Sequence, residues 1–199
     1  MAKQLWLDLE TTGTNENIHG IVEIACILEV NGKEVDSFHS YVRPREGVQY
    51  DPIAMAVNRH AISDLQDFEP ETSVFARFLE RCNEWVDRYN KRDKMIISGF
   101  NCAFDMRHLE AWFLRNNEQW FGNYFWRDVI DLRSFTAWIL RDHRPDMIDG
   151  KLMTVAGEIL TKAQMLEALG GGEAHGADVD IRVTKDTFYN IVNNWEGWR

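Results

Sequence analysis

The stretch Gln4-Leu5-Trp6-Leu7-Asp8-Leu9-Glu10-Thr11-Thr12-Gly13 is a strand-like apolar run that ends in two carboxylates. Asp8 and Glu10 stand at positions i and i+2, so the pleat of a strand points both to the same side of the sheet. Leu9 points the opposite way, into the core. Neighbouring carboxylates repel each other unless one is protonated or a cation neutralises them. An isolated Asp-x-Glu pair is still more typical of a solvent-facing strand edge than of a functional site.

Two more strands are predicted after this stretch, at Ile21 to Val30 and at Val35 to Val42. Asn31-Gly32-Lys33 between them has the chemistry of a hairpin turn. From Thr72 to Tyr89 apolar residues recur three and four apart, which predicts an amphipathic helix. The rest of the chain first alternates short buried strands with helices: a strand at Met95 to Ser98, a helix through Phe104 and Phe113, a strand at Val129 to Leu132 and a helix through Phe135 and Leu140. One or two helices are predicted within Thr154 to Leu169, where Thr161 and Gln164 are placed as a capping box. A last helix is predicted over Ala177 to Asn194.

This order of elements predicts an α/β protein with a mixed five-stranded sheet flanked by helices on both faces. The chain has 199 residues, of which 45% are hydrophobic, and this is enough to bury one sizeable core. Neither a repeat nor a linker divides the chain, and only Gly170-Gly171-Gly172 has the composition of a flexible loop. Residues 1–199 are therefore expected to form a single domain.

The composition narrows the class of protein further. No apolar run is long enough for a membrane span and no signal peptide opens the chain, so a cytoplasmic protein is expected. Cys26, Cys82 and Cys102 stand among apolar neighbours, as reduced core thiols do. The net charge of −10 argues against a broad basic surface for nucleic acid. Contact with nucleic acid must then be local. The objection weakens if several carboxylates converge on divalent cations, which add positive charge where the phosphate lies.

Two further motifs place acidic residues at helix starts. Asn101-Cys-Ala-Phe104-Asp105 follows the strand at Met95 to Ser98, and Asp105 also suits the positive end of a helix dipole. Asn101 has the residue type of an N-cap and is also placed to orient Asp105. In the segment from His175 to Asp180, a histidine in a glycine-flanked loop precedes an aspartate in the first turn of the last helix. A lone histidine of this kind is more often a surface residue than a catalyst.

Taken together and in this order, the motifs resemble the DEDDh branch of the DEDD exonuclease superfamily, which has a ribonuclease-H-like fold. The opening Asp8-Leu-Glu-Thr-Thr-Gly13 is similar to that of proofreading exonucleases of bacterial replicative polymerases, and the resemblance covers Leu5 to about Asn193. It implies that Asp8, Glu10, Asp105 and Asp180 hold metal and that His175 is the general base. Candidate substrate contacts are Leu9, Thr11, Thr12, Asn101 and Phe104.

This resemblance implies hydrolysis of the terminal phosphodiester, 3′ to 5′, with release of nucleoside 5′-monophosphates. Hard oxygen ligands suit two Mg²⁺ or Mn²⁺ ions about 4 Å apart. The expected partner is the 3′ end of single-stranded or frayed DNA, with a polymerase or a second copy of the chain as further candidates. An exoribonuclease or oligoribonuclease that trims RNA is the rival enzyme, and an inactive nuclease-fold binding module is the rival from another class. The complete acidic set together with His175 counts against the inactive module.

Overall fold

The strand that ends in Asp8 and Glu10 lies inside a six-stranded sheet of order β4-β3-β2-β1-β5-β6. The computed structural model describes residues 2–58, 60–141, 151–170 and 176–194. In sequence order the strands are β1 (Lys3–Thr11), β2 (Ile21–Val30), β3 (Lys33–Arg43), β4 (Glu69–Pro70), β5 (Met95–Gly99) and β6 (Phe125–Asp131). The β1-β2-β3 pairs are antiparallel, whereas β5 is parallel to β1, β6 to β5 and β4 to β3.

The α/β class and the mixed sheet are confirmed, but the sheet has one strand more than the five predicted. The additional strand, β4, has only two residues and shows no alternation that a sequence pattern could reveal. The hairpin turn is confirmed: Asn31 and Gly32 have φ angles of 54° and 74°, as a two-residue turn with two left-handed positions requires. β6 begins four residues earlier than predicted. Trp126, Arg127 and Asp128 in its first half are exposed and form no buried apolar run that the sequence could reveal.

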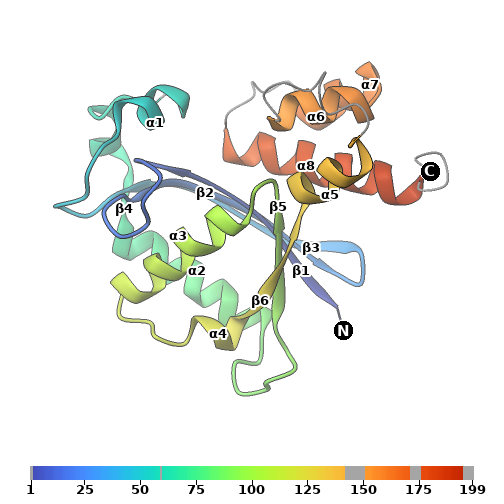
Figure 1. Ribbon diagram of the computed structural model, residues 1–199. Coiled ribbons are helices and arrows are strands. Elements are labelled where there is room, and N and C mark those ends of the chain that lie inside the picture. The colour runs from blue at the N-terminus through green and yellow to red at the C-terminus, as the bar shows by residue number, and fades with distance from the viewer. Residues whose placement is uncertain (1, 59, 142–150, 171–175, 195–199) are drawn as a thin grey trace.

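Helices cover both faces of the sheet, as predicted (Figure 1). They are α1 (Pro52–Val57), the 3₁₀ turn η1 (Asp64–Asp67), α2 (Glu71–Trp85), α3 (Ala103–Arg115), α4 (Phe121–Tyr124), α5 (Leu132–Ile139), α6 (Leu152–Ile159), α7 (Lys162–Leu169) and α8 (Ala177–Asn193). α2 and α3 pack against one face and α8 against the other, with α6 and α7 lying outside α8 (Figure 1). In the described part of the chain no helix has the length and apolar character needed to span a membrane.

The first long helix ends before the predicted residue Tyr89, and this part of the expectation is wrong. α2 stops at Trp85, and Tyr89 is 88% exposed. After the helix, Asp87 Oδ1 accepts a hydrogen bond from the Tyr89 N–H, and Asp93 Oδ2 accepts one from the Asp87 N–H. Side chains that bond to nearby backbone groups in this way compete with the helix and end it.

Two other local predictions are confirmed. Thr161 and Gln164 form the capping box at α7: the Thr161 N–H donates to Gln164 Oε1 at 2.9 Å, and the Gln164 N–H donates to Thr161 Oγ1 at 3.3 Å. Cys26, Cys82 and Cys102 are all free and buried. Burial raises the pKa of each of these thiols, which are therefore uncharged core residues.

Gly99 allows β5 to approach β1 closely. A Cβ at this position would lie 2.7 Å from the Leu7 carbonyl oxygen, a backbone atom that cannot move away without distorting β1. We therefore expect Gly99→Ala to lower the free energy of unfolding by about 1–3 kcal/mol, measured by urea denaturation. Gly122→Ala is the matched control, because nothing lies within 4 Å of the Cβ it would add. Equal stability of the two variants would contradict this close approach.

Candidate active site

Three of the predicted carboxylates meet at the end of β1 under the first turn of α8. Asp8 and Glu10 lie on the same side of β1 as Trp6, whose ring packs against Phe188 of α8 with 5.3 Å between ring centroids. Asp180 stands in the first turn of α8. Asp8, Glu10 and Asp180 each offer a carboxylate oxygen, and the three oxygens lie within 4.8 Å of one another. The strand and the helix therefore bring residues 170 positions apart in the chain into one cluster.

The fourth predicted carboxylate, Asp105, joins this cluster from α3. Its side chain is buried, and its Oδ1 accepts a hydrogen bond of 3.0 Å from the backbone N–H of Leu9. Leu9 is the residue between Asp8 and Glu10, so this bond fixes the start of α3 against the acidic end of β1. Asp105 stands in the first turn of α3, as predicted. β1, α3 and α8 thus contribute the four carboxylates.

The carboxylates strongly disfavour one another's negative charge. Burial, followed by the charges of Asp105, Glu10 and Asp180, raises the pKa of Asp8 well above its usual range. Burial and then Asp180 raise the pKa of Glu10 to about 8. Burial also raises the pKa of Asp105 to about 8, although the Leu9 N–H acts in the opposite direction.

A divalent cation fits this cluster on the chemistry of its donors. Among the described residues, neither Asp8 nor Glu10 forms an ion pair with a lysine or arginine. Positive charge would offset the burial and the repulsion that raise their pKa values, and carboxylate oxygens are the ligands that hard divalent ions prefer. Asp8, Glu10 and Asp180, with Asp105 beside them, are the residues that could hold such an ion.

The predicted general base, His175, lies outside the described residues. The helix that follows it begins at Ala177 with Gly176 as its N-cap. The backbone N–H of Asp180 donates to the Gly176 carbonyl oxygen at 2.9 Å. Asp180 is thereby held in the first turn, five residues after His175 in the sequence.

Three of the candidate substrate contacts come from the end of β1 and the residue directly after it, and they have little exposed surface. Leu9 is buried in the core, as the strand pattern predicted for its side chain. The hydroxyl of Thr11 donates to the Gly13 carbonyl oxygen at 2.8 Å. Thr12 is fully buried, and its hydroxyl donates to the Gln49 carbonyl oxygen at 2.6 Å. Both hydroxyls are thus engaged within the protein.

The other two candidates, Asn101 and Phe104, lie at the start of α3. The expectation that Asn101 caps this helix is wrong: the N-cap is Cys102, and no side chain caps the helix. Asn101 has a φ of 63°, and its backbone N–H donates to Asp131 Oδ1 at 2.8 Å. This left-handed backbone differs from the extended conformation of an N-cap residue. Phe104 is partly exposed and packs against the ring of His108, with 4.4 Å between ring centroids.

The predicted site residues do not include Glu23 and His39, which line the same face of the sheet as Asp8 and Glu10. Glu23 on β2 pairs with Glu10 in the β1-β2 register and is almost fully buried. His39 Nε2 on β3 lies 2.8 Å from Glu23 Oε1, and this contact is the main cause of the raised pKa of His39. The Glu23 charge contributes to the raised pKa of Glu10. Knowledge of the strand register would have identified Glu23, because residues paired across antiparallel strands share a face.

The central strand of this mixed sheet ends in clustered carboxylates that are fit to hold divalent cations. This is the arrangement of a metal-dependent phosphodiester hydrolase. A family model described as exonuclease matches residues 5–188, and the chain belongs to this exonuclease family. The predicted enzyme class is thereby confirmed. The resemblance to exonucleases that the motifs suggested is confirmed as well.

Two kinds of relative match most of this chain in sequence. Ribonuclease T of Shewanella denitrificans is 26% identical over 204 residues, which cover 96% of this chain and 82% of that protein. The PolC-type DNA polymerase III of Thermotoga petrophila is 25% identical over 189 residues, which cover 94% of this chain and 12% of that protein.

Solved structures of exonuclease I share the fold. One exonuclease I structure matches all of this chain with a TM-score of 0.71 and 18% identity, and the match covers 42% of that chain. Escherichia coli exonuclease I in complex with a dA16 oligonucleotide matches with a TM-score of 0.69 and 20% identity, again over all of this chain and 42% of that one. A zinc-bound form of the E. coli enzyme with single-stranded DNA gives a TM-score of 0.72 at 17% identity, over 99% of this chain and 41% of that one. This chain thus spans less than half the length of these structures.

Proposed function

We propose that this protein is a 3′-to-5′ exonuclease that hydrolyses terminal phosphodiesters of single-stranded or frayed DNA ends and releases nucleoside 5′-monophosphates. The observation that carries the proposal is the meeting of Asp8, Glu10 and Asp180 beside Asp105 in a chain of the exonuclease family. DNA as substrate is supported by the shared fold of exonuclease I bound to dA16 and by the PolC-type relatives, which are DNA polymerases. Residues 1–199 would form one exonuclease domain.

The four carboxylates would hold two Mg²⁺ or Mn²⁺ ions, because the set contains only hard oxygen donors. When bound, such ions supply a water of lowered pKa and positive charge for the leaving oxygen. The chain contributes the rigidity of the site. Asp8 and Glu10 are fixed by their pairing with β2, and Asp105 is fixed by the Leu9 N–H.

His175 would take a proton from the attacking water, since a histidine with an ordinary pKa near about 6.5 is largely unprotonated at neutral pH. Thr11 and Thr12 would form the wall beside the terminal nucleotide through their backbone, as their hydroxyls are bonded internally. Phe104, partly exposed next to Asp105, would offer its ring to the terminal base. Asn101 would flank the same end of α3.

A polymerase partner is part of the proposal for DNA, because the PolC-type relatives carry the matching region within a DNA polymerase. The three free, buried cysteines support the proposal of a cytoplasmic protein. The ribonuclease T relatives, which this chain matches over 82% of their length, favour a second candidate, an exoribonuclease that trims RNA 3′ ends.

One digestion panel separates these candidates. Single- and double-stranded DNA and RNA, each labelled at the 5′ end, would be incubated with Mg²⁺, Mn²⁺ or a chelator. We expect labelled single-stranded DNA to shorten one nucleotide at a time in either metal, with mononucleotides released and no reaction in chelator. Faster shortening of RNA than of DNA would support the exoribonuclease instead. If no substrate releases mononucleotides, the inactive nuclease-fold binding module would be favoured instead.

A further inference from the structure

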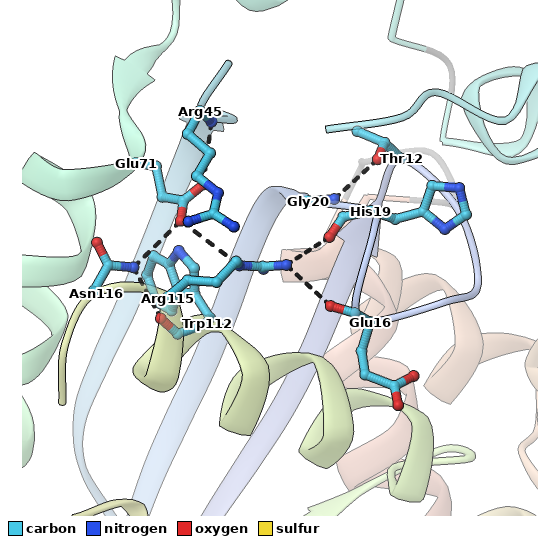
Figure 2. Close-up of polar contacts among 9 residues, drawn as sticks. All are labelled: Thr12, Glu16, His19, Gly20, Arg45, Glu71, Trp112, Arg115 and Asn116. Atoms are coloured by element: carbon cyan, nitrogen blue, oxygen red, sulfur yellow. Dashed lines mark hydrogen bonds and ion pairs between the residues drawn. The ribbon is translucent and has the colours of Figure 1, made fainter. Parts of the chain in front are cut away.

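Arg115, the last residue of α3, is a buried arginine remote from the catalytic cluster. Its side chain is 9% exposed, and its Nη1 donates hydrogen bonds to the carbonyl oxygens of Glu16 at 3.0 Å and His19 at 2.8 Å (Figure 2). Ten residues of helix separate it from Asp105, a distance of about 15 Å along the helix axis. Arg115 therefore contacts the loop between β1 and β2 without reaching the carboxylates.

The opposite side of the guanidinium faces Glu71, the first residue of α2. Arg115 Nε lies 3.9 Å from Glu71 Oε1, and the Glu71 side chain is 3% exposed. The Arg45 N–H and the Asn116 side-chain amide donate to the two Glu71 oxygens at 3.1 and 3.3 Å (Figure 2). A buried ion pair contributes little to net stability because both charges lose their hydration. Glu71 here offsets the buried charge of Arg115, while the two bonds from Arg115 Nη1 to the Glu16 and His19 carbonyl oxygens fix the geometry of the β1-β2 loop.

The loop in turn holds the residues that follow Glu10. The Gly20 N–H donates to Thr12 Oγ1 at 2.9 Å, and the Thr12 N–H donates to the Gly20 carbonyl oxygen at 2.8 Å. Gly13 lies so close to the His19 ring that an added Cβ would be 2.5 Å from it. Displacement of His19 and Gly20 would therefore displace Thr12 and Gly13, directly after the acidic end of β1.

We propose that Arg115 is a positioning residue for the terminal-nucleotide pocket: by holding the carbonyl groups of Glu16 and His19, it fixes the Thr11–Gly13 backbone and so sets the affinity for the 3′ end. This proposal rests on the proposed exonuclease function, in which Thr11 and Thr12 form the wall beside the terminal nucleotide. Arg115 touches neither the substrate nor the carboxylates. Its loss should therefore change KM far more than kcat.

The variant Glu71→Gln/Arg115→Met tests the proposal, because it removes both buried charges together and leaves neither unpaired. We expect KM for a single-stranded DNA oligonucleotide to rise about tenfold or more, with kcat within about threefold and the Mn²⁺ dissociation constant unchanged. Amide hydrogen exchange at Thr12 and Gly20 should be at least about tenfold faster than in the wild type. This second readout requires neither metal nor substrate.

Three single variants complete the test. Arg115→Lys keeps a charge for Glu71 but lacks the guanidinium fork, so KM should rise as well. Glu71→Gln alone keeps both bonds from Arg115 to the loop, and its KM should stay within about threefold of the wild type. Arg127→Met is the matched control, because Arg127 forms an exposed ion pair with Glu110 of α3. Its KM should not change.

The outcomes separate the two proposals. If Arg115→Lys and the double variant lower Tm but keep wild-type KM and wild-type exchange at Thr12 and Gly20, Arg115 has a structural role only and the inference is overturned. If the wild type itself releases no mononucleotides, the proposed function fails. In that case faster exchange at Thr12 and Gly20 would still show that Arg115 holds the loop.

Discussion

Asp8→Asn is expected to reduce kcat for mononucleotide release by at least about 10³-fold, because it removes the central carboxylate of the cluster. Asp8 lies within 4.8 Å of both Glu10 and Asp180, measured between carboxylate oxygens, so a cation held by these three residues would be bound partly by the Asp8 charge. Asparagine keeps the size and shape of the side chain. The loss would therefore be one of charge and metal binding and not of packing.

The metal-free Asp8→Asn protein should also unfold at a Tm equal to or above that of the wild type. Burial and four neighbouring carboxylates raise the pKa of Asp8, so a neutral side chain is favoured in the folded protein. Asp128→Asn is the matched control, since Asp128 is exposed on β6 and lies outside the cluster. Steady-state kinetics in Mn²⁺ and thermal unfolding in chelator measure the two effects. An Asp8→Asn enzyme with kcat within tenfold of the wild type would contradict the role of the cluster.

His175→Ala is expected to slow hydrolysis by about 10² to 10⁴ fold while Mn²⁺ binding is retained. The proposed base must be unprotonated to accept a proton, so wild-type kcat should fall as the pH drops below about 6.5. The variant should lose this acidic limb of the pH profile. Kinetics across pH 5 to 9 and calorimetric titration with Mn²⁺ measure the two properties.

The control for this variant is His143→Ala, which alters a histidine that belongs to none of the catalytic motifs. Its rate and pH profile should match those of the wild type. Normal turnover by His175→Ala would remove the assignment of the base. A loss of Mn²⁺ affinity in step with the rate would assign His175 to the metal site instead.

Local patterns in the sequence were sufficient for most of the fold. The turn residues Asn31 and Gly32 fixed the β2-β3 hairpin, since few other residues adopt two consecutive left-handed positions. The end of α2 was not predictable from hydrophobic spacing, which continues to Tyr89. Asp87 decided it, by accepting a hydrogen bond from the Tyr89 N–H. A competing side-chain bond of this kind has no periodic signature.

The candidate site was predictable where a single element sets the geometry. The spacing of Asp8 and Glu10 placed both on one face of a strand, and the structure adds Asp180 to that face from α8. The meeting of Asp105 and Asp180 with this pair was predicted only through the resemblance to a family, and two other tertiary contacts escaped prediction. Asn101 is bonded through its backbone to Asp131, which follows it by 30 positions, and does not cap α3. Glu23 faces Glu10 only through the strand register.

Anomalous diffraction from crystals grown with Mn²⁺ tests the central claim most directly, because manganese can be located without reference to activity. We expect two anomalous peaks about 4 Å apart, within coordination distance of carboxylate oxygens from Asp8, Glu10, Asp105 and Asp180. The same crystals of Asp8→Asn should lack at least one peak. Wild-type crystals with no peak among these four residues, at Mn²⁺ concentrations that support turnover, would contradict the account.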